Sequence, residues 1–350
     1  MIRRRLSRKV NVGGIPVGGD SPVSVQTMWK MPLTDEKAAV LRKINHLKLI
    51  GCEILRFAVP DMESAEILGQ LSAESPIPLV ADIHFDHRLA LRCLDYPIGK
   101  IRINPGNIGS PRKVREVFLK AAEKGIPVRI GVNAGSLPKD LHELPDRAEA
   151  MVKAAERELE RIAEIDFTGI IISLKSSDIN TTVRANELFV ARFDFPLHLG
   201  VTEAGPVIPG IVKHSIAFAE LFAKGIGDTI RVSLSGSMEE EIQAGKEILR
   251  STGIRTGGVT VISCPRCGRK GFDVTGFLES LGDLFQRTEK PLTVAVMGCE
   301  VNGPGEAREA DIGITGSGNS VVIFRKGMVI KRTDTRKARE DFIKAFEELL

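Results

Sequence analysis

Short apolar runs alternate with longer amphipathic stretches from about Ser21 to Gly253. Each run is rich in β-branched residues and is nearly continuously apolar at its start, as is typical of strands buried on both faces of a parallel sheet. The pattern predicts eight strands, at Val23–Met28, Glu53–Val59, Pro78–His84, Lys100–Asn104, Val128–Asn133, Gly169–Lys175, Leu197–Thr202 and Thr229–Leu234.

The intervals between these runs have apolar residues three and four positions apart, which indicates helices. The clearest predicted helices are Asp35–Ile50, Ser110–Lys124, Arg147–Ile165, Ile211–Lys224 and Met238–Arg250. Ser110 precedes Pro111, as an N-cap precedes a first-turn proline. Glycines stand where helices should stop, at Gly51, Gly125, Gly225 and Gly253.

Eight β/α units in about 250 residues predict a (β/α)8 TIM barrel, with a doubly wound open sheet as the main alternative. After Gly253 the character of the chain changes to glycine-rich turns, short strands and a final helix at Arg336–Leu350. Strands are expected here at Val259–Ser263, Leu292–Met297 and Ser320–Arg325. We therefore predict a barrel domain over residues 1–253 and a smaller α+β domain over residues 254–350.

Composition narrows the function classes. The chain has 350 residues, and 49 basic against 45 acidic residues leave a net charge of only +4, so no global field marks a nucleic-acid binder. A basic segment at residues 1–10 leaves open an RNA-binding arm, but interleaved aromatic residues are lacking and a solvated first strand is the preferred interpretation. No signal peptide is indicated, and no run approaches the ~20 apolar residues of a membrane-spanning helix. We expect a cytoplasmic protein that binds neither nucleic acid nor membrane.

Polar side chains interrupt nearly every predicted strand near its carboxyl end, where a barrel carries its active site. They are Gln26, Arg56, Asp82, His84, Arg102, Asn104, Arg129, Asn133, Lys175, His198, Glu203, Arg231 and Ser233. Charges so close to a buried sheet are costly unless they are paired or solvated, so their recurrence indicates convergence on one site. For any single residue, a structural ion pair across the barrel is the alternative.

The cations of this set are Arg56, Arg102, Arg129, Lys175 and Arg231, and only Asp82 and Glu203 oppose them. Arginine forks bind phosphate oxygens in pairs and remain charged at neutral pH. The strand ends therefore predict a site for a small phosphate or diphosphate.

The second constellation lies in the C-terminal region. Cys264 and Cys267 form a Cys-x-x-Cys knuckle, and Cys299 follows at a distance within Gly298–Glu306. Zinc and an iron–sulfur cluster compete for such thiolates. All six histidines occur at or before His214, so no histidine can close a zinc tetrahedron here. Three thiolates holding a [4Fe–4S] cluster leave one iron available, and Glu306 is a candidate for that position.

Alternatives to the cluster remain at this stage. The knuckle could be a structural zinc site or a dithiol redox pair, and a zinc-containing barrel enzyme acting on a sugar phosphate is the second candidate function. Cys52 and Cys93 are interpreted as small buried residues. The glycine-rich Gly313–Gly318 stretch lacks the strand–turn–helix context of a nucleotide-binding loop.

Across the whole length, the sequence resembles the 4-hydroxy-3-methylbut-2-en-1-yl diphosphate synthases of the non-mevalonate isoprenoid pathway, in their two-domain bacterial form. The motifs that carry the resemblance are Val25–Met28, Ala81–Phe85, Arg102–Asn107, Arg129–Asn133, Leu199–Gly205, the cysteine knuckle and Cys299–Glu306. The resemblance implies reductive ring opening of 2-C-methyl-D-erythritol 2,4-cyclodiphosphate to (E)-4-hydroxy-3-methylbut-2-enyl diphosphate.

The resemblance also implies a ferredoxin-sulfite-reductase-like cluster domain. Its [4Fe–4S] cluster would be held by Cys264, Cys267, Cys299 and Glu306. The substrate would contact Arg56, Arg102, Arg129, Asn133, Lys175, His198, Arg231 and Ser233, and we add Asp82, His84 and Asn104 to that surface. Reduced ferredoxin or flavodoxin would donate electrons. A homodimer is implied, in which the cluster domain of one chain closes over the barrel of the other.

We further interpret Glu203 as the proton donor, because a carboxylic acid near the leaving hydroxyl can act as a general acid. One departure from the family pattern follows the first strand, where this chain has Trp29-Lys30-Met31. A substrate contact from that loop is not expected.

Overall fold

The computed structural model describes residues 4–33, 36–104, 108–264, 272–298, 307–317 and 320–350. These residues form two compact units, Met1–Arg255 and Thr256–Leu350, which are described separately. Among the described residues, no helix is long and apolar enough to cross a membrane.

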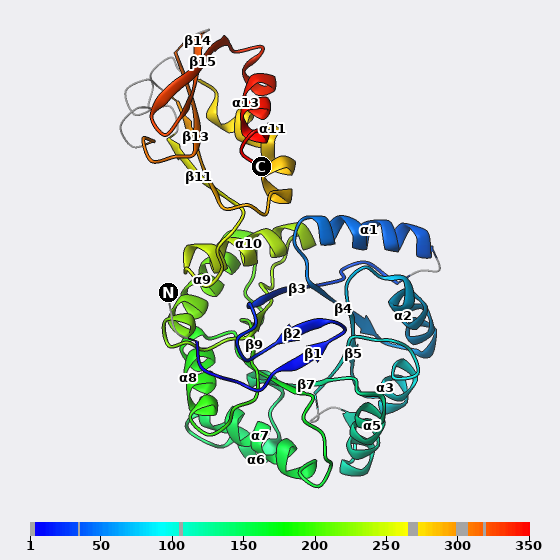
Figure 1. The fold of residues 1–350 in the computed structure, drawn as a ribbon. Helices are drawn as coiled ribbons and strands as arrows, with labels where there is room; N and C mark the ends of the chain where they lie inside the picture. Colours follow the sequence, from blue (N-terminus) through cyan, green and yellow to red (C-terminus); the bar gives the residue numbers. More distant parts are fainter. Residues whose placement is uncertain (1–3, 34–35, 105–107, 265–271, 299–306, 318–319) are drawn as a thin grey trace. The chain divides into compact units, whose positions relative to one another are not determined.

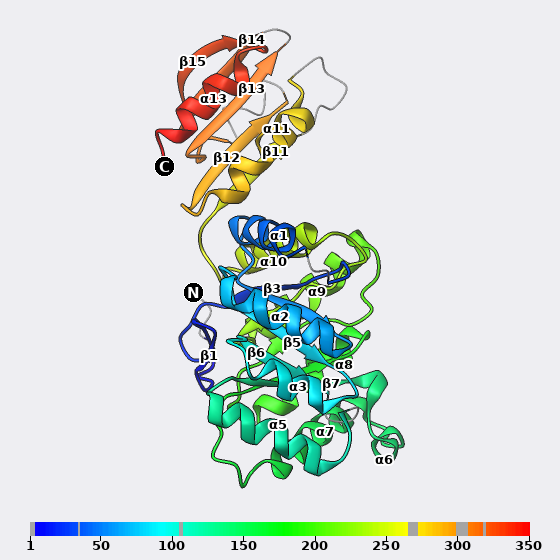
Figure 2. The same ribbon diagram turned by 90° about the vertical axis from the view of Figure 1, so that its right-hand side faces the viewer.

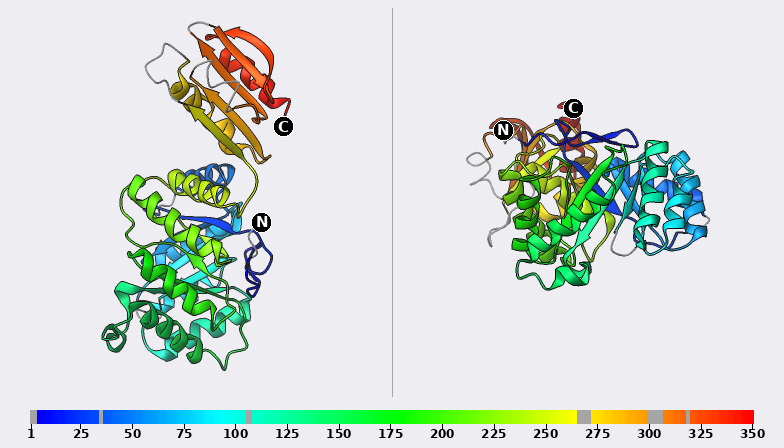
Figure 3. Two further views of the ribbon diagram at one scale, coloured as in Figure 1. Left: turned by 90° about the vertical axis from the view of Figure 1, so that its left-hand side faces the viewer. Right: turned by 90° about the horizontal axis from the view of Figure 1, so that it is seen from below.

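The first unit is a parallel β-barrel surrounded by helices, as Figures 1 and 3 show. Its strands are β3 (Ser24–Met28), β4 (Ile54–Val59), β5 (Leu79–Ile83), β6 (Lys100–Ile103), β7 (Val128–Asn133), β8 (Ile170–Lys175), β9 (His198–Leu199) and β10 (Thr229–Ile230). Neighbours in sequence are neighbours in the sheet, and β10 pairs with β3 in parallel. A single bridge between Ile172 and Leu197 joins β8 to the segment that enters β9. The predicted TIM barrel is therefore confirmed, and the open doubly wound sheet is wrong.

The helices of this unit follow the strands in the predicted alternation. They are α1 (Lys37–Leu49), α2 (Met62–Glu74), α3 (His87–Cys93), α5 (Pro111–Lys124), α6 (Lys139–His142), α7 (Arg147–Arg161), α8 (Ile179–Val190), α9 (Val207–Ala223) and α10 (Met238–Ser251), with a 3-10 turn η1 (Ala134–Ser136).

Local capping sets several of the helix ends. The side chains of Asp61, Asp146 and Asp178 accept hydrogen bonds from the first turns of α2, α7 and α8. Ser237 forms a reciprocal capping box with Glu240 at the start of α10. Ser110 occupies the N-cap of α5 before Pro111, as predicted, although its side chain makes no capping hydrogen bond.

Alternation along the strands separates two environments. On β4, Leu55, Phe57 and Val59 belong to the large apolar core shared with the helices, whereas the intervening residues face the barrel interior. This core lies between the sheet and the helices, so it fixes the outer face of every strand and leaves the inner face for polar groups.

A β-hairpin closes the end of the barrel at which the strands begin. It consists of β1 (Val10–Val12) and β2 (Ile15–Val17), which pair in an antiparallel manner. Positive φ values at Gly13 (54°) and Gly14 (94°) provide the tight turn. Valines of the hairpin form an apolar cluster with Ile54, Val80 and Ile171, and Figure 1 shows the hairpin across the middle of the barrel. The sequence analysis did not predict this hairpin.

The basic segment before the hairpin is bound to the barrel. Arg4 donates to Asp228 Oδ1 at 2.7 Å, and Ser7 Oγ donates to the same oxygen at 2.9 Å. Asp228 Oδ2 also accepts from the backbone N–H of Leu197 at 2.8 Å, beside the weakly paired entrance to β9. These contacts give the arginines a structural role at the seam between β8 and β9.

The second unit is a mixed five-stranded sheet with helices packed on one face (Figure 2). Its elements are β11 (Val259–Cys264), α11 (Val274–Arg287), β12 (Leu292–Met297), β13 (Ile312–Ser317), β14 (Ser320–Arg325), β15 (Met328–Asp334) and α13 (Ala338–Glu347). Three of these elements, α11, β13 and β15, were not among the predicted ones. The glycine-rich 313–317 stretch lies on β13, so it is a strand and not a nucleotide loop.

Candidate active site

The barrel interior is lined with buried cations. Lys100, Arg102, Arg129 and Lys175 are between 1% and 8% exposed, and they come from β6, β7 and β8. Two further arginines, Arg56 and Arg231, have side chains that are 12% and 13% exposed. The structure thus brings together the five predicted cations and adds Lys100, which the sequence analysis did not single out.

Asp82 is the acidic centre among these cations. Its Oδ1 accepts a 2.8 Å hydrogen bond from Arg102 Nη1, and its Oδ2 lies 3.6 Å from Arg56 Nε. His84 Nε2 is 3.3 Å from the same carboxylate and 2.6 Å from Arg102 Nη1. Burial alone would raise the pKa of Asp82, but Arg56, His84 and Arg102 hold it far below its ordinary value. Asp82 is therefore ionised and orients two cations from neighbouring strands.

Glu241 of α10 is a second acidic centre that sequence analysis missed. It is fully buried, and its Oε1 and Oε2 accept from Arg231 Nη2 and Nε at 3.0 and 3.2 Å. Thr27 Oγ1 and the backbone N–H of Leu234 also donate to this carboxylate. The fork fixes Arg231 in one orientation. No strand pattern could reveal this acid, because it reaches the barrel from the helix that follows β10.

Several interior groups have no partner to offset their burial. Among the described residues, Lys100 Nζ and both ring nitrogens of His198 have no hydrogen-bond partner. Burial, followed by the neighbouring arginines, lowers the pKa of Lys100 well below its ordinary value. Burial, followed by Lys175, lowers the pKa of His198 as well, so its ring is neutral. Burial, followed by surrounding cations, lowers the pKa values of Lys175 and Arg129, while that of Arg56 falls to about 10.

Two glycines leave room for these cations. A Cβ atom built on Gly131 of β7 would lie 3.0 Å from Arg102 Nε, and one on Gly200 would lie 2.5 Å from Lys175 Nζ. Both glycines occupy inward positions, two residues after Arg129 and His198 respectively. The long cationic side chains therefore cross space that any larger residue would fill.

Three further predicted residues lie at or after the carboxyl ends of their strands, whereas Gln26 lies in the middle of β3. Asn104 follows β6, is 5% exposed and donates to Ser136 Oγ at 3.0 Å. Asn133 ends β7, and Ser233 follows β10 with its backbone N–H donating to His214 Nε2 at 3.2 Å. Gln26 on β3 donates to Thr229 Oγ1 at 2.6 Å, within the barrel.

Glu203 lies apart from this cluster, on the loop that follows β9. It is exposed, and its backbone has a positive φ of 52°, which is uncommon for a residue with a side chain. The structure therefore places Glu203 outside the buried cationic set with which the sequence analysis grouped it. Such backbone strain is typical of functional loops.

The atypical Trp29-Lys30-Met31 segment is anchored to the barrel. Trp29 stacks on Phe57 with ring centroids 5.1 Å apart. Lys30 Nζ donates to the carbonyl oxygen of Leu234 and pairs with Glu241 Oε1, both at 2.8 Å. The segment thus joins the ends of β3 and β10 and supports the carboxylate that holds Arg231.

Of the predicted cluster ligands, Cys264 is described, whereas Cys267, Cys299 and Glu306 lie outside the described residues. Cys264 ends β11 and pairs in register with Met297 at the end of parallel β12. The backbone N–H of Gly298 donates to the Cys264 carbonyl oxygen at 3.1 Å. The described ends of β11 and β12 are therefore adjacent. Within the described residues, no group of three His, Cys, Asp or Glu side chains forms a metal site.

The other two cysteines are buried, as predicted. Cys52 is 2% exposed and Cys93 is fully buried. Burial raises the pKa of each thiol to about 12. They are unreactive packing residues.

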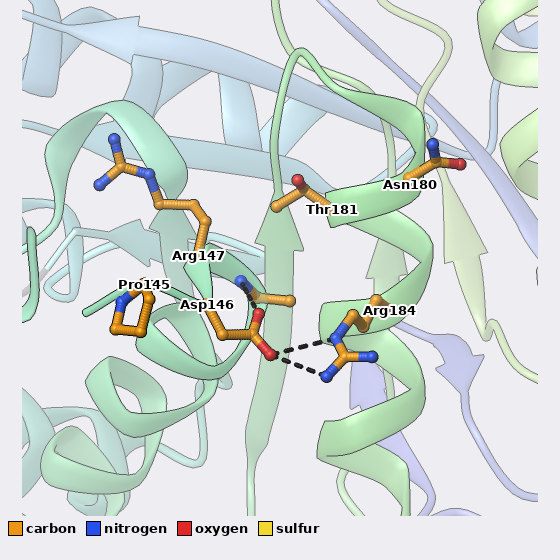
Figure 4. Close-up of a pocket in the computed structure, with 7 residues that line it drawn as sticks. Pro145, Asp146, Arg147, Asn180, Thr181 and Arg184 are labelled. Carbon is orange, nitrogen blue, oxygen red and sulfur yellow. Dashed lines mark hydrogen bonds and ion pairs between the residues drawn. The ribbon is translucent and has the colours of Figure 1, made fainter.

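A separate hollow of about 560 Å³ lies between the N-termini of α7 and α8, and Figure 4 shows its lining. Asp146, the N-cap of α7, accepts from Arg184 Nη2 at 2.8 Å across this hollow. Arg147 lies near the pair and contacts His142 Nδ1. Arg147 and Arg184 face a single acid, Asp146, in this lining, so the excess of positive charge is smaller than in the barrel interior.

Comparisons with known proteins decide the family. The family model described as the GcpE TIM-barrel domain matches residues 7–246, and that described as the GcpE protein C-terminal domain matches residues 260–348. The chain belongs to the GcpE family. The resemblance inferred from the motifs is therefore confirmed, and the GcpE models cover both units of the structure.

Relatives of this GcpE chain share nearly its full length. A protein of Treponema denticola named 4-hydroxy-3-methylbut-2-en-1-yl diphosphate synthase (flavodoxin) is 49% identical, with 98% of this chain and 97% of the relative covered. A protein of the same name from Geobacter sulfurreducens is 46% identical, with 98% of each covered. Dihydropteroate synthase from Xanthomonas albilineans matches with a TM-score of 0.50 at 16% identity, over 71% of this chain and 100% of that chain. That likeness shows the fold alone.

Proposed function

We propose that the chain catalyses the reaction for which its relatives are named. It binds 2-C-methyl-D-erythritol 2,4-cyclodiphosphate in the barrel and converts it to (E)-4-hydroxy-3-methylbut-2-enyl diphosphate. The reaction consumes two electrons and a proton, breaks the C–O bond that closes the ring and releases water. The observation that carries this proposal is the excess of buried cations inside the barrel, where Lys100, Arg102, Arg129 and Lys175 are at most 8% exposed.

The cations have a defined task in this reaction. Breaking the ring C–O bond leaves additional negative charge on the diphosphate, and fixed cations in a desolvated site stabilise developing negative charge. Arg102 and Arg56 are held by Asp82, and Arg231 is held by Glu241, so their forks are oriented before substrate arrives. Asn104, Asn133, His198 and Ser233 supply neutral polar contacts around them. His84 lies beside Asp82 and extends this surface.

Electrons require a redox centre, for which we propose a [4Fe–4S] cluster held by Cys264, Cys267, Cys299 and Glu306. Its support is the thiolate set and the adjacent ends of β11 and β12. When bound, the cluster supplies low-potential electrons for reductive C–O cleavage. We assign reduced flavodoxin as the electron donor from the names of the relatives, with ferredoxin as the alternative. A homodimer with sites built across two chains belongs to the same proposal.

The proposal is tested on protein purified without oxygen. We expect iron and acid-labile sulfide, visible absorption, and turnover of the cyclodiphosphate with reduced flavodoxin. Cys264→Ser should lose iron, sulfide and absorption, because a serine hydroxyl is a poor replacement for a thiolate ligand. Cys93→Ala is the matched control, since Cys93 is fully buried in the barrel unit, and it should retain all three.

Two results would contradict parts of this proposal. A colourless protein that contains zinc and no sulfide would contradict the proposal and favour the zinc-containing sugar-phosphate enzyme. Full iron and sulfide in Cys264→Ser would remove this residue from the ligand set.

A further inference from the structure

Lys100 occupies the deepest cationic position on β6. Ile101 and Ile103 belong to the apolar core between strands and helices, so Lys100 and Arg102 face the interior. Lys100 pairs in register with Val80, which is part of the apolar cluster that closes the barrel. The Lys100 side chain therefore begins one inward position closer than Arg102 to the closed end of the barrel.

Among the residues that the structure describes, no acid acts on this amine. The charged and titratable groups that act on Lys100 are Arg129 of β7 and Arg56 of β4, and Lys100 in turn acts on His198 of β9. Lys100 is 1% exposed, and neither its Nζ nor either ring nitrogen of His198 has a hydrogen-bond partner among the described residues.

A contribution to the stability of the fold does not explain a lysine at position 100. A buried amine without a partner costs free energy, and methionine, an unbranched apolar residue of similar length, would fit the position without that cost. Groups that destabilise the fold in this way are typical of binding sites, where a ligand supplies the missing partner.

We propose that Lys100, Arg129 and His198 form a lower tier of the cradle that receives one phosphate group of the substrate at the closed end of the barrel. The identity of the substrate rests on the proposed function, whereas the lower tier itself requires only a phosphate-bearing anion. Arg56, Arg102, Lys175 and Arg231 would then contact the second phosphate nearer the mouth.

Binding at this tier should be coupled to protonation. Burial and the neighbouring arginines disfavour the charged form of Lys100 when no anion is present, because they lower its pKa well below the ordinary value. A phosphate oxygen placed beside Nζ favours the ammonium form, so the protein should take up a proton as the ligand binds. Each phosphorus of the cyclodiphosphate carries a single strongly acidic oxygen, so the ligand itself does not titrate near neutral pH.

The experiment compares the wild-type holoenzyme with Lys100→Met by thermal unfolding and titration calorimetry. We expect ligand-free Lys100→Met to unfold at the same or a higher temperature than wild type. Its Kd for the cyclodiphosphate should be about 10- to 100-fold weaker, the loss expected for a hydrogen bond to a charged group. Proton uptake, measured at pH 8 in buffers of different ionisation enthalpy, should fall. Lys120→Met is the control, because Lys120 lies on α5 and binds the Leu91 carbonyl oxygen and Asp95.

Three results would overturn the lower tier. They are a Kd within twofold of wild type, an unfolding temperature of ligand-free Lys100→Met below that of wild type, and no proton uptake by the wild-type protein. If Lys100→Met does not fold, Lys100→Gln replaces it, and proton uptake by the wild type remains a separate test.

A second ligand separates this inference from the proposed function. Inorganic diphosphate should also bind wild type more tightly than Lys100→Met. The cyclodiphosphate could fail to bind wild type while inorganic diphosphate still binds wild type more tightly than Lys100→Met. In that case the proposed substrate is wrong, and the lower tier is supported. If the cyclodiphosphate binds both proteins equally, the tier is wrong and the substrate stands.

Discussion

At the scale of single residues, the site is defined by buried charges that are held in place before any ligand arrives. Asp82 orients Arg102 by a hydrogen bond and Arg56 by an ion pair. Glu241 holds Arg231 and also accepts a hydrogen bond from the backbone N–H of Leu234. Such preorganisation reduces the rearrangement needed when substrate binds. The exposed Glu203 is different, because its position depends on a loop with a strained backbone.

We predict that Glu203→Gln lowers turnover by about 100-fold or more, because glutamine cannot donate the proton of a carboxylic acid. Substrate affinity and iron content should stay unchanged, since Glu203 is exposed and lies outside the buried cationic cluster. Steady-state turnover, calorimetry and iron analysis measure these quantities. Glu123→Gln, a change at an exposed residue on α5, is the matched control. Wild-type turnover in Glu203→Gln would remove this residue from the mechanism.

Much of the candidate site could be read from the sequence at this scale. In a barrel strand, alternate residues point outward into the core and inward into the barrel. Charged residues that interrupt the apolar strands are therefore expected inside the barrel, and five were predicted there: Arg56, Asp82, Arg102, Arg129 and Lys175. Glu241 could not be found in this way, since it comes from a helix whose orientation depends on tertiary packing. Lys100 shared the inward periodicity of Arg102, but it begins its predicted strand, and the sequence analysis considered only residues near the strand ends.

At the scale of elements, a buried histidine connects the loops around the mouth. His214 of α9 accepts hydrogen bonds at Nε2 from the backbone N–H groups of Val201 and Ser233, at 3.1 and 3.2 Å. Its Nδ1 donates to the Gly210 carbonyl oxygen at 2.8 Å. These contacts fix the neutral tautomer and hold the loops after β9 and β10 against α9.

This arrangement predicts a pH-dependent stability. Burial lowers the pKa of His214 to about 4, whereas the unfolded chain has the ordinary value of about 6.5. The unfolded state therefore binds more protons below pH 6.5, and the stabilisation present above that pH is lost as pH falls toward 4. At pH 5 the loss from this residue is about 2 kcal/mol, because each unit of pKa difference corresponds to about 1.4 kcal/mol.

Urea unfolding at pH 7.5 and pH 5.0 measures this effect. The chain has one tryptophan, Trp29, which lies in the barrel unit, so its fluorescence reports the unfolding of that unit. His214→Gln should be less stable at pH 7.5 and should lose less stability on acidification than wild type. His142→Gln, an exposed control, should behave like wild type. Equal acid sensitivity in wild type and His214→Gln would contradict the assignment.

Elements differed in how readily the sequence predicted them. Strands that are buried on both faces, such as β4 and β8, have nearly continuous apolar patterns and were predicted within a few residues. The β1–β2 hairpin was missed because its strands are three residues long and its valines acquire a buried face only against the barrel. β15 was missed because it is largely exposed and carries little periodicity.

At the scale of the whole molecule, the chemistry is divided between two units with separate cores. The buried cations belong to the barrel, and Cys264 belongs to the second unit. In the proposed reaction, the substrate contacts and the cluster would therefore come from different units, either of one chain or of two.

Mixed dimers distinguish these arrangements. Arg231→Gln disables the barrel part, and Cys264→Ser disables the cluster part, so each variant alone should be inactive. If sites are built across chains, each mixed dimer has one intact site of two, so about half of wild-type activity should return in the purified mixed dimer. If each chain builds its own site, activity stays near zero. Co-expression with two affinity tags and assay of the doubly purified dimer measures this directly.

The hairpin of β1 and β2 has one further consequence. Its valines close the end of the barrel at which the strands begin. Molecules must therefore enter and leave through the opposite end. Incoming cyclodiphosphate and outgoing linear diphosphate then share one passage and the same anchoring groups. For a substrate bound as proposed, we therefore expect product release to precede the next cycle, and accumulated product to compete with substrate for the barrel.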